Sequence, residues 1–216
     1  NRIEDLINFN EKLVEIFNQR GFLLRSYVTI LIIILLMSLG QLILNRKHLW
    51  WGRALLIFAM SVPLAFLLLP LVHQPSILRS SLVVVVIASA CTALICWAFS
   101  NTRDRIIAIS CITAIALVVD QWTGMNLIQG SPLGYDVISA ARFYGIGNEY
   151  MGILIGAACT GGAGIIEGMK PHRLVKVSIL VTISWVVILF TLLSPNIGAN
   201  VGGTIAGFFA FGITVL

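Results

Sequence analysis

Long apolar stretches, separated by short polar connections, occupy most of the chain after residue 26. A helix needs about 20 mostly apolar residues to cross the hydrocarbon core of a bilayer, and each stretch meets or approaches that length. The stretches cover residues 27–44, 54–72, 81–99, 106–122, 150–166, 174–193 and 197–216. The pattern predicts an all-α fold, a polytopic transmembrane helical bundle of about seven spans with a long outer loop between spans four and five.

The first 25 residues follow a different pattern. Apolar side chains recur there at helical spacing and most charged side chains fall between them, which is typical of an amphipathic helix. The apolar set is Ile3, Leu6, Ile7, Leu13, Val14 and Phe17. We therefore expect an amphipathic linker helix on the extracytoplasmic side over residues 1–25 and a transmembrane helical domain over residues 26–216. Since the sequence starts at Asn1 and stops within an apolar stretch, we expect it to be a fragment of a longer chain.

The composition excludes a water-soluble globule. Of the 216 residues 58% are apolar and 11% are charged, whereas about 25% are charged in an ordinary soluble domain. So few charges suffice only where most of the surface faces hydrocarbon. The net charge of +5 does not indicate a nucleic-acid partner, because Lys and Arg in a membrane protein gather in cytoplasmic loops. The lipid bilayer is the expected partner, and nucleic acid is not.

The basic residues are unequally shared between the connections. The first, third and fifth connections hold eight of them, and the second, fourth and sixth hold two. The eight are Arg46, Lys47, Arg53, Arg103, Arg105, Lys170, Arg173 and Lys176, and the two are Arg79 and Arg142. Because short cytoplasmic loops are the ones enriched in Lys and Arg, we expect a multi-pass protein with the first set of connections in the cytoplasm and the N-terminal end outside.

Glycine is concentrated in the second half of the chain. Sixteen of the nineteen glycines lie at or after Gly124. Three pairs are spaced four apart, namely Gly152 with Gly156, Gly198 with Gly202, and Gly203 with Gly207. Small residues at this spacing let two helices approach closely in lipid. We expect the fifth and seventh spans to pack together or each against one neighbour; the alternative is a substrate path lined by exposed backbone.

The long connection between the fourth and fifth spans, within residues 120–152, carries the most chemistry. Arg142 is its one cation, and a guanidinium binds a phosphate or carboxylate in a bidentate manner. The alternative is a structural ion pair with Asp136 or Asp120. Asp120 ends an apolar stretch, so it is either a span-terminal residue or an intramembrane carboxylate paired with Arg142.

The end of this connection contains further polar candidates. Residues 137–145 are expected to form a short helix that stops at Gly145. Asn148 is then near the N-cap of the fifth span, and Glu149 lies in the first turn of that span. The alternative for Glu149 is a structural role, in which its carboxylate balances the positive end of the helix dipole. Tyr144 is a candidate ligand or an interfacial aromatic residue.

The sixth connection lies on the same side of the membrane and adds Asn196 and Asn200. Such amides bind ligands in clefts, and they also cap helices and join spans. The predicted substrate-binding set is Arg142, Asp120, Asp136, Tyr144, Asn148, Glu149, Asn196 and Asn200.

Familiar catalytic and cofactor motifs are missing from the sequence. It has no GxSxG, HExxH, phosphate-binding loop or dinucleotide fingerprint. Cys91, Cys96, Cys111 and Cys159 all fall in apolar stretches without metal-ligand spacing. We expect no cofactor and no metal site, and the sequence leaves the catalytic residues, and whether the protein is an enzyme, undecided.

Two stretches, SPLGYDVISAARFYGIGN and PNIGANVGG, resemble a pattern in uncharacterised bacterial polytopic membrane proteins, some with an extracytoplasmic alkaline-phosphatase-like domain. The resemblance covers roughly a fifth of the chain. It implies a bacterial cell membrane and an upstream extracytoplasmic domain as a partner, and it transfers no catalytic residue to this chain.

Three functions follow from these observations. The first is a bacterial membrane domain with an extracytoplasmic-face site for an anionic lipid or a polyprenyl-linked cell-envelope precursor. The second is a multi-span transporter or flippase that uses the glycine-rich spans as a movable path. The third is the membrane anchor of an upstream extracytoplasmic hydrolase domain.

Overall fold

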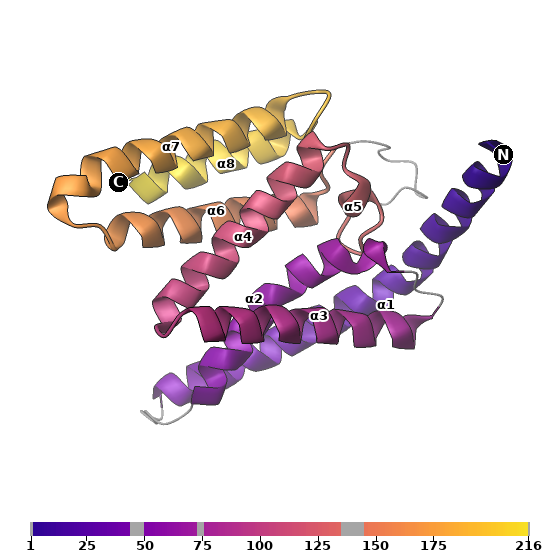
Figure 1. The fold of residues 1–216 in the computed structure, drawn as a ribbon, viewed down its shortest axis with the longest axis horizontal. Coiled ribbons are helices and arrows are strands. Elements are labelled where there is room, and N and C mark those ends of the chain that lie inside the picture. Colours follow the sequence, from indigo (N-terminus) through magenta and orange to yellow (C-terminus); the bar gives the residue numbers. More distant parts are fainter. Residues whose placement is uncertain (1, 44–49, 73–75, 135–144, 216) are drawn as a thin grey trace.

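The fold is a bundle of α-helices, seen in a computed structural model that describes residues 2–43, 50–72, 76–134 and 145–215 (Figure 1). The helices are α1 (Arg2–Ile43), α2 (Trp50–Leu68), a 3₁₀ turn (Leu69–Leu71), α3 (Ile77–Ala98), α4 (Thr102–Trp122), α5 (Asn126–Gln129), α6 (Asn148–Glu167), α7 (Pro171–Leu193) and α8 (Val201–Val215). The described residues contain no strand. The prediction of an all-α polytopic bundle is confirmed.

Six of the described helices are long and apolar enough to cross a membrane, and they coincide with six of the seven predicted spans to within a few residues at their ends. The seventh prediction, residues 197–216, is shorter than expected as a helix because α8 has 15 residues and begins only at Val201. The residues before it form a tight turn in which the amides of Gly198 and Asn200 donate to the carbonyls of Thr191 and Leu192. The turn packs against the end of α7, so these residues do not extend α8.

Helix α1 is longer than either element predicted within it. It has 42 residues, and its apolar part, Phe17–Gly40, continues from the amphipathic N-terminal stretch without a break. The N-terminal part of α1 projects beyond the other helices in Figure 1. The predicted linker and the first span are therefore one continuous helix.

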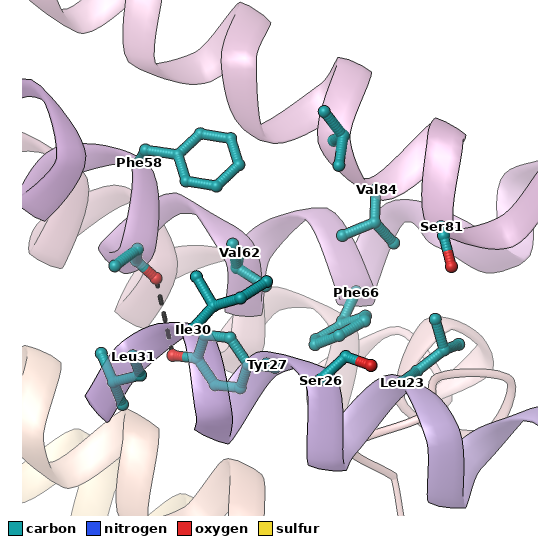
Figure 2. Close-up of a pocket in the computed structure, with 12 residues that line it drawn as sticks. Leu23, Ser26, Tyr27, Ile30, Leu31, Phe58, Val62, Phe66, Ser81 and Val84 are labelled. Carbon is teal, nitrogen blue, oxygen red and sulfur yellow. Dashed lines mark hydrogen bonds between the residues drawn. The ribbon is translucent and has the colours of Figure 1, made fainter. Parts of the chain in front are cut away.

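The bundle has two groups of helices. Helices α1, α2 and α3 pack together, as do α4, α6, α7 and α8, and the main contact between the groups is between α2 and α4. Within the first group, Tyr27 of α1 lies edge-on to Phe66 of α2 and donates a long hydrogen bond, 3.5 Å, to the carbonyl of Ala59 (Figure 2). An apolar cleft of about 90 Å³ lies beside this contact, between α1, α2 and α3.

Glycines allow α6 to approach its neighbours closely. A Cβ on Gly161 would lie 2.8 Å from Sγ of Cys111 in α4, and one on Gly162 would lie 2.7 Å from Cζ2 of Trp185 in α7. A Cβ on Gly203 of α8 would lie 2.5 Å from Cγ of Met151 in α6. The predicted contact between the fifth and seventh spans is therefore confirmed at Gly203.

The predicted pair Gly152 and Gly156 behaves differently, since a Cβ at either position would meet nothing within 4 Å. Both glycines are exposed on α6. The close helix packing therefore depends on other glycines of α6, which lie nearer the middle and the end of the helix.

The connections alternate between two ends of the bundle (Figure 1). At one end, called the basic end here, α1 stops and α2 begins, and the connections from α3 to α4 and from α6 to α7 lie there too. At the other, called the polar end, α4 stops, α5 follows, α6 begins and α7 turns into α8. Among the described connections, those of the basic end carry most of the Lys and Arg, while α1 brings further cations, such as Arg20, to the polar end.

Candidate site at the polar end

Asp120 lies in the last turn of α4 and is buried. Its Oδ1 accepts a hydrogen bond from the Leu127 amide at 3.0 Å, and its Oδ2 accepts one from the Ile128 amide at 2.8 Å. The chain reverses between these groups through Gly124 and Met125, which have φ values of 105° and 60°. Both oxygens of the carboxylate therefore satisfy amides of the first turn of α5, which have no partner within that helix.

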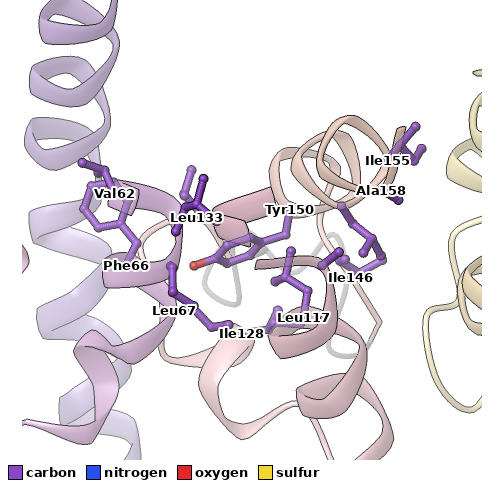
Figure 3. Packing of buried hydrophobic residues seen from close by; sticks show 14 of the residues in the cluster. Val62, Phe66, Leu67, Leu117, Ile128, Leu133, Ile146, Tyr150, Ile155 and Ala158 are labelled. Carbon is purple, nitrogen blue, oxygen red and sulfur yellow. The ribbon is translucent and has the colours of Figure 1, made fainter. Parts of the chain in front are cut away.

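Tyr150 is a fully buried polar side chain of this end and was not in the predicted set. Its hydroxyl lies 2.6 Å from the Ser131 hydroxyl, and it donates to the Pro63 carbonyl at 3.4 Å. Figure 3 shows the ring among Leu67, Leu117, Ile128, Leu133 and Ile146. The hydroxyl thus joins α6 to α2 and to the turn after α5.

No sequence signal identified Tyr150. A tyrosine at the start of an apolar span is typical of the interfacial aromatic belt. Its two partners are 19 and 87 residues away, so no local periodicity connects them with it.

Asn200 is buried and connects the starts of α6 and α8. Its Nδ2 donates to the Ile146 carbonyl at 3.1 Å and to Oδ1 of Asn148 at 3.4 Å, and its Oδ1 accepts from the Gly203 amide at 2.8 Å. The last bond caps the N-terminus of α8. Asn200 thus caps one helix and joins two spans. This is the alternative to ligand binding that the sequence offered for its amide.

Backbone contacts also join the segment before α6 to the segment before α8. The Ile146 amide donates to the Gly198 carbonyl at 2.8 Å. Gly145 has a φ of 87°, and a Cβ there would lie 2.4 Å from that carbonyl oxygen. The approach of the two loops therefore requires glycine at position 145.

Glu149 pairs with a residue outside the predicted set. Arg20 of α1 donates to its Oε1 at 2.8 Å, and the two side chains are 18% and 41% exposed. This ion pair joins α1 to the first turn of α6. The two residues are 129 positions apart, so the sequence pattern contained no signal for the pairing.

The remaining predicted residues are distributed as follows. Asn148 and Asn196 are exposed at the polar end. Asp136, Arg142, Tyr144 and the predicted helix over residues 137–145 lie outside the described residues, apart from Gly145 itself. Of the described candidates, the structure brings Asn148 and Asn200 into contact, and it places Asp120 beside the turn that holds Ser131.

Three polar atoms on α4 lack a hydrogen-bond partner among the described residues. They are Oγ of Ser110, Oγ1 of Thr113 and Oε1 of Gln121, all buried. Among all residues that the structure describes, no three His, Cys, Asp or Glu side chains come close enough to hold a metal ion.

The helices and their composition define an integral membrane protein of the multi-pass class, with a polar network at one end and a basic second end. Comparisons with known proteins add no family. No protein-family model, no curated protein and no solved structure matches the chain.

Proposed function

We propose that this membrane protein binds an anionic amphiphile at its polar end, either a lipid or a polyprenyl-linked cell-envelope precursor, with Arg142 as the anion clamp. A guanidinium is suited to this role because its planar donors match the oxygens of a phosphate or carboxylate. The apolar spans offer the hydrocarbon part of the same molecule its usual surroundings.

One observation carries the proposal. The two described carboxylates of the polar end already have partners, since Asp120 accepts two backbone bonds and Glu149 is paired with Arg20. Glu149 is therefore already paired with another cation, and both oxygens of Asp120 already accept hydrogen bonds, while Asp136, the other predicted partner of Arg142, lies outside the described residues. Residues 135–144, which include Arg142, are joined covalently to this end at Gly134 and at Gly145.

The proposed location is the extracytoplasmic face of a bacterial membrane, with the N-terminal end outside. Support comes from the excess of Lys and Arg in the first, third and fifth connections, which favours the cytoplasm for those connections. The resemblance of the two sequence stretches to bacterial polytopic proteins supports the bacterial assignment.

The test is a binding measurement on the purified protein in lipid nanodiscs. The Arg142→Ala variant is expected to weaken the binding of phosphatidylglycerol by about ten- to a hundredfold, which corresponds to the loss of about 1.5–3 kcal/mol from hydrogen bonds to a charged group. Arg142→Lys keeps the charge but not the bidentate geometry and should lie between the two.

The matched control is Arg79→Ala, which removes the same charge from an exposed position at the same end. It should leave the affinity unchanged. Equal affinity in the wild type and in Arg142→Ala would refute the proposal, and equal weakening by Arg79→Ala would reduce it to general surface charge.

A second candidate function is the membrane anchor of an extracytoplasmic hydrolase domain. It is favoured by α1, whose 42 residues span roughly 63 Å at 1.5 Å per residue, about twice the 30 Å of the hydrocarbon core. Replacing residues 26–216 with unrelated spans in the full-length protein should preserve hydrolase activity if anchoring is the only role.

A further inference from the structure

One side of α7 points away from the rest of the bundle. Its buried residues, such as Val181, Trp185 and Ile188, lie on the side that packs against α6 and α8. At 3.6 residues per turn, seven exposed side chains fall within an arc of about 120° on the other side of the helix. They are His172, Arg173, Lys176, Ile179, Leu180, Ile183 and Val187. This side, called the outer side of α7 here, faces the surroundings of the bundle.

The outer side of α7 changes in character along the helix. Near the basic end it carries two cations, Arg173 and Lys176, whose spacing of three residues brings their Cβ atoms to within about 5–6 Å of each other. Farther along it carries apolar side chains, with Leu180 65% and Ile183 53% exposed. The outer side therefore presents charge at the end of the helix and hydrocarbon toward its middle.

Lys176 lies inside a candidate membrane span rather than before it. The span begins at Pro171, about 7.5 Å from Lys176 along the helix axis, and the neighbouring Val175 is 70% exposed. A lysine at this depth keeps its carbon stem among hydrocarbon and extends its ammonium group toward the membrane interface. The ammonium group is therefore at the level of the lipid headgroups.

The protein offers these two cations no counter-ion. The acidic side chains described at the basic end are engaged elsewhere, since Glu167 pairs with Arg103 at 3.5 Å and Asp104 accepts a hydrogen bond from Asn101 at 3.3 Å. Among the described residues neither Arg173 nor Lys176 has an ion-pair partner. Because charged side chains within membrane spans are almost always paired, these two require an anion from outside the chain.

The neighbouring apolar side chains identify the anion as part of an amphiphile. A soluble acidic protein or a free phosphate matches the cations and leaves Ile179, Leu180 and Ile183 exposed. Helices that associate in lipid do so through small residues, and the seven residues of the outer side include none. A second copy of the chain would also bring no free carboxylate from its described basic end. A phospholipid supplies both parts, a phosphate at the headgroup level and an acyl chain below it.

We infer that Arg173 and Lys176 bind the phosphate of an anionic phospholipid in the leaflet at the basic end, with an acyl chain of that lipid lying along Ile179, Leu180 and Ile183. Basic residues beside a membrane span attract anionic headgroups in this way. The site goes beyond the proposed function, since it lies at the basic end and uses no residue of the polar end.

The experiment uses the protein in phosphatidylcholine nanodiscs that contain a phosphatidylglycerol with a diazirine close to its headgroup. After photolysis, crosslinked peptides are mapped by mass spectrometry. The wild type is expected to give crosslinks concentrated on residues 171–180. A phosphatidylcholine with the same diazirine should give no such concentration, and an excess of soluble glycerol phosphate should not compete. These two arms separate an anionic lipid from lipid in general and from free phosphate.

The double variant Arg173→Gln, Lys176→Gln should raise the fraction of phosphatidylglycerol needed for half-maximal crosslinking on α7 by about thirtyfold. Each Lys or Arg near an anionic membrane surface contributes about a factor of five, and two are removed. The double variant Arg173→Lys, Lys176→Arg keeps both charges and should retain the crosslinks. The matched control Arg53→Gln removes an exposed cation of the same end from α2 and should leave them unchanged.

Arg142→Ala should also leave the crosslinks on α7 unchanged, so this inference and the proposed function can fail separately. Equal crosslinking by the two lipids, or crosslinks that persist in the double glutamine variant, would overturn the inference. Protein–protein crosslinks along the outer side of α7, with the lipid probe excluded from it, would overturn it in favour of a partner helix.

Discussion

At the residue scale, Asp120 and Tyr150 direct their buried polar groups at the protein's own backbone and loops. Asp120 satisfies two amides of α5, and the Tyr150 hydroxyl lies between Ser131 and the Pro63 carbonyl. A buried polar group without a partner costs about 1–3 kcal/mol, so each of these contacts stabilises a specific position of one loop on one helix. They hold the scaffold to which the proposed anion site is attached.

Replacing Tyr150 by Phe should test this role directly. The change leaves the Ser131 hydroxyl and the Pro63 carbonyl without their shared partner, and we expect the free energy of unfolding to fall by about 1–3 kcal/mol. Thermal denaturation in a single detergent measures it. The matched variant Tyr27→Phe removes a hydroxyl that is only half-buried and makes a longer bond of 3.5 Å. Its effect should be smaller, and an equal loss in both variants would contradict the assignment.

At the element scale, glycines determine how closely α6 approaches its neighbours. Gly162 faces Trp185, whose ring is stacked on Phe211 of α8 with centroids 5.0 Å apart. Gly156 faces open space on the same helix. The two positions are identical in residue type and opposite in surroundings, which makes them a natural pair for comparison.

Gly162→Ala is expected to destabilise the protein by about 1–3 kcal/mol, because the new methyl group overpacks the contact between α6 and α7. Gly156→Ala is expected to be neutral or to stabilise by up to about 1 kcal/mol, because alanine loses less backbone freedom than glycine in a helix. Both are measured by thermal denaturation of the purified variants. Equal effects at the two positions would mean that the contact with Trp185 does not limit the packing.

At the scale of the whole molecule, the alternation of the helices separates the charges. Arg105 donates to the carbonyls of Cys96 and Phe99 at the end of α3, and Arg103 donates to Gly164 near the end of α6. Cations at helix C-termini balance the free carbonyls there and the negative end of the helix dipole. The arginines of the basic end therefore have a local role in helix capping, and the proposed orientation assigns them a second role, that of keeping this end in the cytoplasm.

The proposed orientation predicts the outcome of a cysteine-labelling experiment in intact bacterial cells. In a background with the four native cysteines replaced by alanine, Asn196→Cys at the polar end should react with a membrane-impermeant maleimide. Ser100→Cys at the basic end should react only after the cells are permeabilised. Both positions are exposed, so burial does not explain a difference. The reverse pattern would place the polar end in the cytoplasm.

The sequence alone determined the class and most of the spans. In hydrocarbon every backbone group must be bonded within the segment, so apolar stretches of sufficient length have little choice but to form helices. The same constraint does not act on residues 197–200, where the chain turns against α7, and for this reason the seventh predicted span started four residues too early.

The tertiary structure decided which polar residues meet. Asn200 and Asn148 were recognised as candidates because amides beside glycines stand out in an apolar chain, and they are indeed in contact. Tyr150 with Ser131 and Glu149 with Arg20 left no trace in the sequence pattern, because the partners lie in other segments, in the turn after α5 and in α1. Local spacing encodes the face of one helix, whereas the partner of a buried side chain depends on how the helices pack, and only the folded bundle determines that.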